Sequence, residues 1–291
     1  MKNILVATDF SEAAYHATSY AYEMAETFGA QLIIYTAYHE MPVILPEMPL
    51  ITTPEDMRTY TKELLMQNVV QLNSKGKIPI KTDCSEEDAA SGIIMAAKKY
   101  NADIIVVGMK GTGRNMRKMF GSTVTSLINK TSIPMLVVPG HVKFTPIKTL
   151  VLANESDLPP QTDIQLINII EEVAKKFNSK IYLVRIVKNE IKEAFGMLDS
   201  PLRIKGKFKS FSPEYICLHG ESVVSGLNKF IHEHNVDLLI TLSHQHVQMM
   251  RWLAASTTVN LIYHIAVPLL VLPVDKKSSP AEHKLHSEII L

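Results

Sequence analysis

An internal repeat constrains the fold of this chain more than any other feature of its sequence. The segment NADIIVV at residues 101–107 returns as NVDLLIT at residues 235–241, and IPMLVVP at 133–139 returns as VPLLVLP at 267–273. Both pairs are 134 residues apart, so no length change separates the two copies in this region. Self-similarity of this kind indicates that one structural unit occurs twice. A chain of 291 residues has room for two domains of about 140 residues each.

The beginning of the unit also recurs, at a larger offset. The segment ILVATD at residues 4–9 corresponds to TLVLAN at residues 149–154, so the loops between the copies differ in length. We therefore predict a first domain at residues 1–141 and a second at residues 146–275, followed by a polar, mobile tail at residues 276–291.

Within each copy, short apolar runs alternate with longer stretches of helical periodicity. The apolar runs are nearly continuous, as in strands buried on both faces of a parallel sheet. The first helix is predicted over residues 12–28, with Ser11 as N-cap and Gly29 as C-cap. This order predicts an α/β fold of two tandem doubly wound, Rossmann-like domains, each with a five-stranded parallel sheet. In the first domain we expect strands at residues 4–8, 31–37, 78–83, 103–108 and 134–139, and further helices at 56–74, 86–100 and 121–131.

Composition excludes several classes of function. Thirty basic and 29 acidic residues leave a net charge of +1, so no overall field favours nucleic acid or an anionic membrane. No apolar run approaches the roughly 18 residues of a membrane span, and the N-terminus has no export signal. Cys84 and Cys217 lack metal-ligand spacing and would form one disulfide at most. We therefore expect a cytoplasmic protein with free thiols, and neither nucleic acid nor membrane as a partner.

A loop containing several glycines follows the predicted strand at residues 103–108. It includes Gly108, Gly111 and Gly121, and Ser122 opens the next helix. Glycines let backbone N–H groups approach phosphate oxygens, and a helix N-terminus adds donors and partial positive charge. The spacing matches neither the Walker A pattern nor the dinucleotide fingerprint. From the residues alone, a phosphate-binding loop and an ordinary strand-to-helix loop are equally supported.

The spacing Gly108-x₂-Gly111-x₉-Gly121-Ser122 resembles the ATP-binding pattern of the universal stress protein family, without gaps. The opening strand that ends at Asp9 and the two repeated segments of the first half support the resemblance. The likeness covers the whole first half and, more loosely, the second, so the chain is similar to a tandem universal stress protein. The family fold is a five-stranded parallel sheet with adenosine lying across the strand ends.

The resemblance implies ATP as the ligand, accompanied by Mg²⁺, and assigns roles to individual residues. Asp9 and the backbone near Ala7 contact the adenosine, and Thr36 offers main-chain bonds to adenine. Thr36 departs from the family, which has an apolar residue there, but a backbone contact tolerates the change. For Asp9, the residues alone favour a turn or helix-capping aspartate. Gly108 and Gly111 lie along the ribose and α-phosphate, and the outer phosphates are held by Gly121, Ser122, Thr123 and Val124.

The second copy has lost the glycines of this pattern. At the same offset, Leu242, Gln245 and Ala255 stand where the first copy has glycine, and Asn154 replaces Asp9. Ser256 and Thr257 remain at the start of the helix, where capping alone explains them. We expect the larger side chains to fill the second site, so that ATP binds only in the first domain.

Three features of the sequence leave alternatives open. His244 and His246 could chelate a metal. No carboxylate or cysteine lies close by in the sequence to complete the ligand set, which favours solvated histidines. Residues 40–55, with four prolines, form a loop folded over the domain or onto a partner. The basic side chains of the glycine loop either contact phosphates or face solvent, namely Lys110, Arg114, Arg117 and Lys118.

Together these features predict an ATP-binding stress-response regulator. A nucleotide-dependent hydrolase or transferase and a pure interaction module are the alternatives. The loop shows no pair of base and nucleophile, which leaves slow hydrolysis by metal and positioning alone. The resemblance also implies that the strands at 135–139 and 269–273 pair within one chain as an intramolecular pseudo-dimer. Whether whole chains form a homodimer, and which protein partner they meet, stays open.

Overall fold

The computed structural model describes nine parts of the chain. These are residues 1–38, 53–72, 76–109, 122–154, 164–187, 208, 210–219, 223–244 and 267–274. The proline-rich segment at 40–55 lies mostly outside them, and the predicted tail at 276–291 lies wholly outside them.

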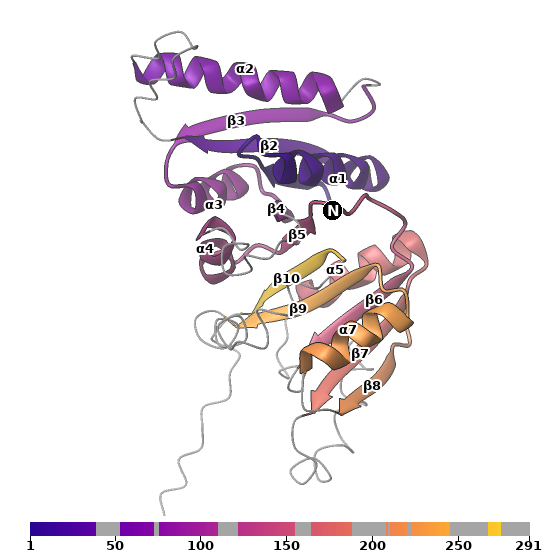
Figure 1. The fold of residues 1–291 in the computed structure, drawn as a ribbon. Helices are drawn as coiled ribbons and strands as arrows, with labels where there is room; N and C mark the ends of the chain where they lie inside the picture. The colour runs from indigo at the N-terminus through magenta and orange to yellow at the C-terminus, as the bar shows by residue number, and fades with distance from the viewer. Residues whose placement is uncertain are drawn as a thin grey trace, which may run out of the picture.

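Ten strands form one sheet that runs through both halves of the molecule (Figure 1). The first half contributes β1 (Asn3–Ala7), β2 (Gln31–Tyr38), β3 (Ile80–Glu86), β4 (Ile104–Met109) and β5 (Met135–Pro139). The second half contributes β6 (Thr149–Asn154), β7 (Lys180–Val187), β8 (Glu214–His219), β9 (Leu238–His244) and β10 (Leu269–Val274).

The strand order is β3-β2-β1-β4-β5-β10-β9-β6-β7-β8. Every neighbouring pair is parallel except β5 and β10, which run antiparallel with Leu270 opposite Leu136. The two halves therefore repeat one order and meet through their last strands. The predicted fold class is confirmed, including the pairing of the two halves within one chain.

Helices cover both faces of this sheet. The first half has α1 (Glu12–Phe28), α2 (Pro54–Leu72), α3 (Ala89–Lys99) and α4 (Ser122–Lys130), and the second half has α5 (Ile164–Phe177) and α7 (Val223–Glu233). One hydrophobic cluster contains side chains of α1, α2 and α5, and the cluster on the other face contains side chains of α3, α4 and α7. None of the described helices combines the length and apolar character needed to cross a membrane.

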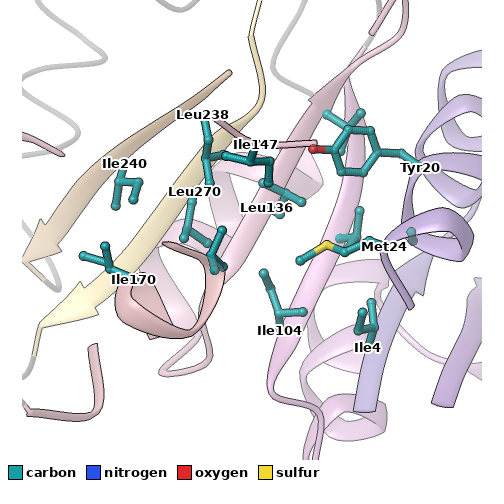
Figure 2. Close-up of a cluster of buried hydrophobic side chains, with 14 of the residues drawn as sticks. Ile4, Tyr20, Met24, Ile104, Leu136, Ile147, Ile170, Leu238, Ile240 and Leu270 are labelled. Atoms are coloured by element: carbon teal, nitrogen blue, oxygen red, sulfur yellow. The ribbon is translucent and has the colours of Figure 1, made fainter. Parts of the chain in front are cut away.

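The first cluster crosses the junction between the halves. Phe144, in the segment between β5 and β6, packs edge-on against Tyr20 of α1, with ring centroids 5.0 Å apart, and also contacts Phe177 of α5. Figure 2 shows side chains from both halves converging here, among them Ile4, Tyr20, Met24, Leu136, Ile170, Leu238 and Leu270.

The first helix begins and ends where the sequence predicts. Ser11 Oγ accepts a hydrogen bond from the Ala14 N–H at 3.3 Å, which caps the helix N-terminus. Gly29 adopts a left-handed φ of 66° at the other end, a conformation that costs glycine little. The first turn of α1 is thereby fixed beside the carboxyl end of β1.

The repeated Asn-x-Asp segment has the same structural role in both halves. Asn101 and Asn235 take left-handed φ values of 49° and 47°, which asparagine tolerates better than most residues. Asp103 and Asp237 follow two positions later, directly before β4 and β9, and bind the start of the parallel neighbouring strand, β1 or β6. Asp103 Oδ2 accepts from the N–H groups of Lys2 and Asn3, and Asp237 Oδ2 accepts from those of Lys148 and Thr149.

Candidate functional site

A pocket with a cavity volume of about 280 Å³ lies at the carboxyl ends of β1, β2 and β4. Ligands of doubly wound sheets bind at this edge. The loop from β1 to α1 and the beginnings of α1, α3 and α4 complete its walls. The lining residues are Ala7, Thr8, Asp9, Ser11, Ala13, Ala14, Tyr35, Ala37, Ala89, Ile93, Val107, Gly108, Thr123 and Val124.

The chemistry of the lining differs between its two sides. On the side of β2 and α3 the pocket is bounded by Tyr35, Ala37, Ala89 and Ile93, which present mostly apolar surface. Hydroxyl and carboxylate groups come from the β1–α1 loop and from α4. Such a pocket suits a ligand with a flat apolar group at one end and polar or charged groups at the other.

The β1–α1 loop is held in an unusual conformation. Phe10 has a φ of 61°, which is rare for a bulky residue. Thr8 Oγ1 accepts a hydrogen bond from the Phe10 N–H at 3.0 Å, and the Thr8 N–H donates to the Tyr35 carbonyl at 2.9 Å. Backbone strain of this kind persists where surrounding contacts enforce it, often beside a functional site.

Asp9 lies in this loop and lines the pocket. Its side chain is exposed, and Oδ1 accepts a hydrogen bond from the Ser11 N–H at 3.0 Å. The turn role that the residues alone favour is therefore present. A carboxylate has about four lone-pair sites, so one such bond leaves capacity for a ligand hydroxyl.

Gly108 lines the pocket at the end of β4, and the packing of α1 accounts for it. A Cβ at this position would lie 2.4 Å from the carbonyl oxygen of Ala13 and 2.7 Å from its carbonyl carbon. Both are backbone atoms in the first turn of α1, which cannot move aside as a flexible side chain can. The packing of α1 against β4 therefore requires glycine at position 108, whether or not a phosphate is bound.

Thr36 is buried and does not line the pocket, whereas both of its neighbours do. Successive side chains of a strand point to opposite faces, so Tyr35 and Ala37 share the pocket face. Sequence reasoning missed these two residues, although the period of two in β2 would have identified them. The main-chain bond to adenine assigned to Thr36 stays a prediction.

The structure brings together Ala7, Asp9, Gly108, Thr123 and Val124 from the predicted set. Ser122 is the first residue of α4, whose N-terminal turn reaches the pocket through Thr123 and Val124. Gly111 and Gly121 lie outside the described residues, together with Lys110, Arg114, Arg117 and Lys118.

In the second half, Leu242 occupies the position of Gly108 and is buried in the core cluster on the α5 face. A large buried side chain therefore stands where the first half has glycine. Strand register corrects one predicted substitution: Leu150 pairs with Leu238 as Ile4 pairs with Ile104, so Asn154, the last residue of β6, corresponds to Thr8 and not to Asp9. The counterpart of Asp9 is Glu155, which lies outside the described residues. The other predicted substitutions, Gln245, Ala255, Ser256 and Thr257, lie outside the described residues.

The described residues contain no group of three or more His, Cys, Asp or Glu side chains placed to hold a metal ion. His244 ends β9, and His246 lies outside the described part of the chain. Cys84 and Cys217, which have free thiols, occupy equivalent positions on β3 and β8, opposite Thr36 and Arg185 respectively.

Comparison with known proteins identifies the family. The model of the universal stress protein family matches residues 1–139. The stress response protein NhaX of Bacillus subtilis is 30% identical over 164 residues, which cover 46% of this chain and 96% of that protein. The chain belongs to the universal stress protein family. A universal stress protein of Thermus aquaticus is 29% identical over 144 residues, which cover 47% of this chain and 98% of that protein.

The fold likeness to this family extends over both halves. The crystal structure of a universal stress protein from Archaeoglobus fulgidus superposes with a TM-score of 0.72 at 15% identity, over 93% of this chain and 98% of that one. At this identity the likeness concerns the fold alone. It agrees with a universal stress protein fold in the second half as well as in the first.

Proposed function

We propose that this universal stress protein binds ATP in the first-half pocket and acts as a stress-response regulator, with no nucleotide in its second half. The position of the pocket carries the proposal, because it lies where β1, β2 and β4 end and where α4 begins. The glycine spacing that starts at Gly108 runs between β4 and α4, so the segment with the family's ATP-binding pattern connects two walls of this pocket.

The two sides of the pocket suit the two ends of a nucleotide. An adenine ring is flat and largely apolar, which fits the side formed by Tyr35, Ala37 and Ile93. Phosphates are favoured near a helix N-terminus, where backbone N–H groups lack helical partners, and Thr123 adds a hydroxyl there. Asp9 lines the same pocket from the β1–α1 loop, where a ribose hydroxyl would donate to its carboxylate.

Mg²⁺ fits this arrangement as a companion of the phosphates. It prefers oxygen ligands and usually keeps several waters, with one or two protein groups and the phosphates completing its shell. The Thr123 hydroxyl and the Asp9 carboxylate are among the oxygen ligands that the described lining offers, together with the hydroxyls of Thr8 and Ser11. The ion would neutralise phosphate charge at the beginning of α4.

The lining supports binding rather than rapid turnover. Among its described residues, Asp9 is the one carboxylate, and the lining includes no histidine, lysine or cysteine. Phosphoryl transfer needs a group that orients the attacking water. We expect phosphate release from ATP to be slow; rapid release would favour the hydrolase alternative.

The test compares ATP binding by the wild type and by Asp9→Asn. Asparagine retains an oxygen that can accept from the Ser11 N–H, so the loop should stay folded, but the charge is lost. A hydrogen bond to a charged group contributes about 1.5–3 kcal/mol, so the dissociation constant should rise roughly tenfold or more. Isothermal titration calorimetry with Mg-ATP measures this change and the stoichiometry, for which we expect one ATP per chain.

The control is Glu233→Gln, which removes the charge of an exposed carboxylate on α7 in the second half and should leave the affinity unchanged. Failure of the wild type to bind ATP at millimolar concentration would exclude the proposed function and favour an interaction module. Two ATP molecules per chain would exclude the asymmetry between the halves.

A further inference from the structure

One side of the pocket is defined by a buried hydroxyl pair. Tyr35 is 2% exposed, and its hydroxyl lies 2.6 Å from Ser85 Oγ on the neighbouring strand β3. Burial raises the pKa of Tyr35, which the bond to Ser85 partly offsets, so the phenol is neutral at physiological pH. The ring is therefore fixed by one hydrogen bond and by its packing between β3 and α3.

A glycine in α3 makes room for this hydroxyl. A Cβ at Gly92 would lie 2.2 Å from the Tyr35 hydroxyl oxygen and 3.3 Å from the ring carbon that carries it. Glycine is unfavourable inside a helix, so its presence in α3 calls for a packing reason. The Tyr35 hydroxyl supplies this reason. We call Tyr35, Ser85 and Gly92 the Tyr35 cluster.

The second half keeps the glycine but lacks the hydroxyl pair. By strand register, Val184 stands in the place of Tyr35 and Leu218 in the place of Ser85, while Gly226 of α7 corresponds to Gly92. A Cβ at Gly226 would meet nothing closer than Leu218, at 4.0 Å, which is an ordinary contact. The Tyr35 cluster thus occurs in the half that carries the glycine pattern and not at the matching positions of the other.

We propose that the Tyr35 cluster sets the depth of the pocket at its apolar end, and so makes Tyr35 a positioning and specificity residue for the base of the bound nucleotide. This inference rests on the proposed function. Tyr35 is buried and lines the pocket between β2 and α3, together with Ala37, Ala89 and Ile93. Gly92 keeps the ring withdrawn from that space, and Ser85 holds it there.

The decisive variant is Gly92→Ala. Its methyl group has to displace the Tyr35 hydroxyl. Because the pocket is the open space beside the ring, we expect the ring to move into it. A misfit of about one methylene between a ligand and a hydrophobic pocket changes affinity by about 10–200-fold, so a ring pushed into the pocket should weaken ATP binding at least roughly tenfold. The double variant Gly92→Ala/Tyr35→Phe lacks the displaced oxygen but also the bond to Ser85, so it should recover the affinity to the level of Ser85→Ala.

Gly226→Ala is the matched control. It makes the same change at the corresponding helix position of the second half, where the clearance is 4.0 Å, and should leave the affinity for ATP unchanged. Ser85→Ala removes the hydroxyl partner without adding bulk and should weaken ATP binding several-fold. If Gly92→Ala does not fold, Ser85→Ala alone tests the proposal.

Calorimetry with Mg-ATP on the full chain distinguishes the outcomes. Wild-type affinity in Gly92→Ala, or in Ser85→Ala where Gly92→Ala is unfolded, would overturn this inference and leave the proposed function intact. Weaker binding in Gly92→Ala without recovery in the double variant would also overturn it, because the effect would then not pass through the Tyr35 hydroxyl. A wild type that binds no ATP would overturn both proposals.

Discussion

At the scale of single residues, Gly108 shows how one position can satisfy a family pattern for two reasons. It stands first in the glycine spacing of the family, and a side chain there would collide with the backbone of Ala13. The contact requires glycine in the absence of any ligand. Leu242, at the same position of the second half, shows that the sheet itself accepts a large side chain there.

Gly108→Ala should therefore lower the stability of the ligand-free protein. The added methyl group forces α1 away from β4, and overpacking of this kind typically costs about 1–3 kcal/mol. Thermal unfolding without nucleotide measures the loss, with Gly226→Ala as a control that should not be destabilised. An unchanged melting temperature for Gly108→Ala would show that the glycine serves ligand binding alone.

At the scale of elements, the two aspartates of the repeated segment join the starts of two strand pairs, β4 with β1 and β9 with β6. Asp103 and Asp237 each accept two backbone N–H groups at the start of the strand that lies beside them. These bonds satisfy donors that a strand end would otherwise leave to water. They explain why the segment recurs although the two halves differ in their ligand-binding residues.

Replacing either aspartate by alanine should destabilise the protein, and Asp237→Ala should have the larger effect. Asp237 is half-buried whereas Asp103 is exposed, so water compensates less for the loss in the second half. We expect about 1–2 kcal/mol for Asp237→Ala, or a fall in melting temperature of a few degrees. Equal melting temperatures for both variants and the wild type would contradict this role.

Local sequence signals predicted most elements of the first half and only part of the site. The limits of α1 follow from Ser11 and Gly29 because caps are local. The site is harder to predict because it collects residues from six helices and strands, and apolar residues such as Ile93 carry no chemical signature. Tyr35 could not be predicted from local sequence because its role depends on Ser85 and Gly92. These residues are distant from it in sequence and contact it only through strand pairing and helix packing.

At the scale of the whole molecule, the halves share their core. Both hydrophobic clusters include residues on either side of the β5–β10 junction, such as Leu136 and Leu270 in one cluster and Val137 and Leu269 in the other. The connecting segment adds Phe144 to the same interior. Neither half buries its last strand without the other, so we expect their stabilities to be coupled.

Leu270→Ala tests this coupling. Leu270 is 2% exposed, and truncating such a residue typically costs about 2–5 kcal/mol. Hydrogen exchange should become faster in β5 and β4 of the first half as well as in β10 and β9. Met95→Ala, on an exposed side chain of α3, should change neither. Faster exchange confined to residues 149–274 would show that the halves unfold independently.

The antiparallel contact of β5 with β10 also has an evolutionary consequence. In a symmetric dimer of identical subunits, every substitution appears on both sides of the interface, so a change that abolishes one site abolishes its copy. Here the two sides of the same sheet are encoded separately. Leucine can stand at position 242 while glycine is kept at position 108, so selection acts on each half alone even though they fold as one body.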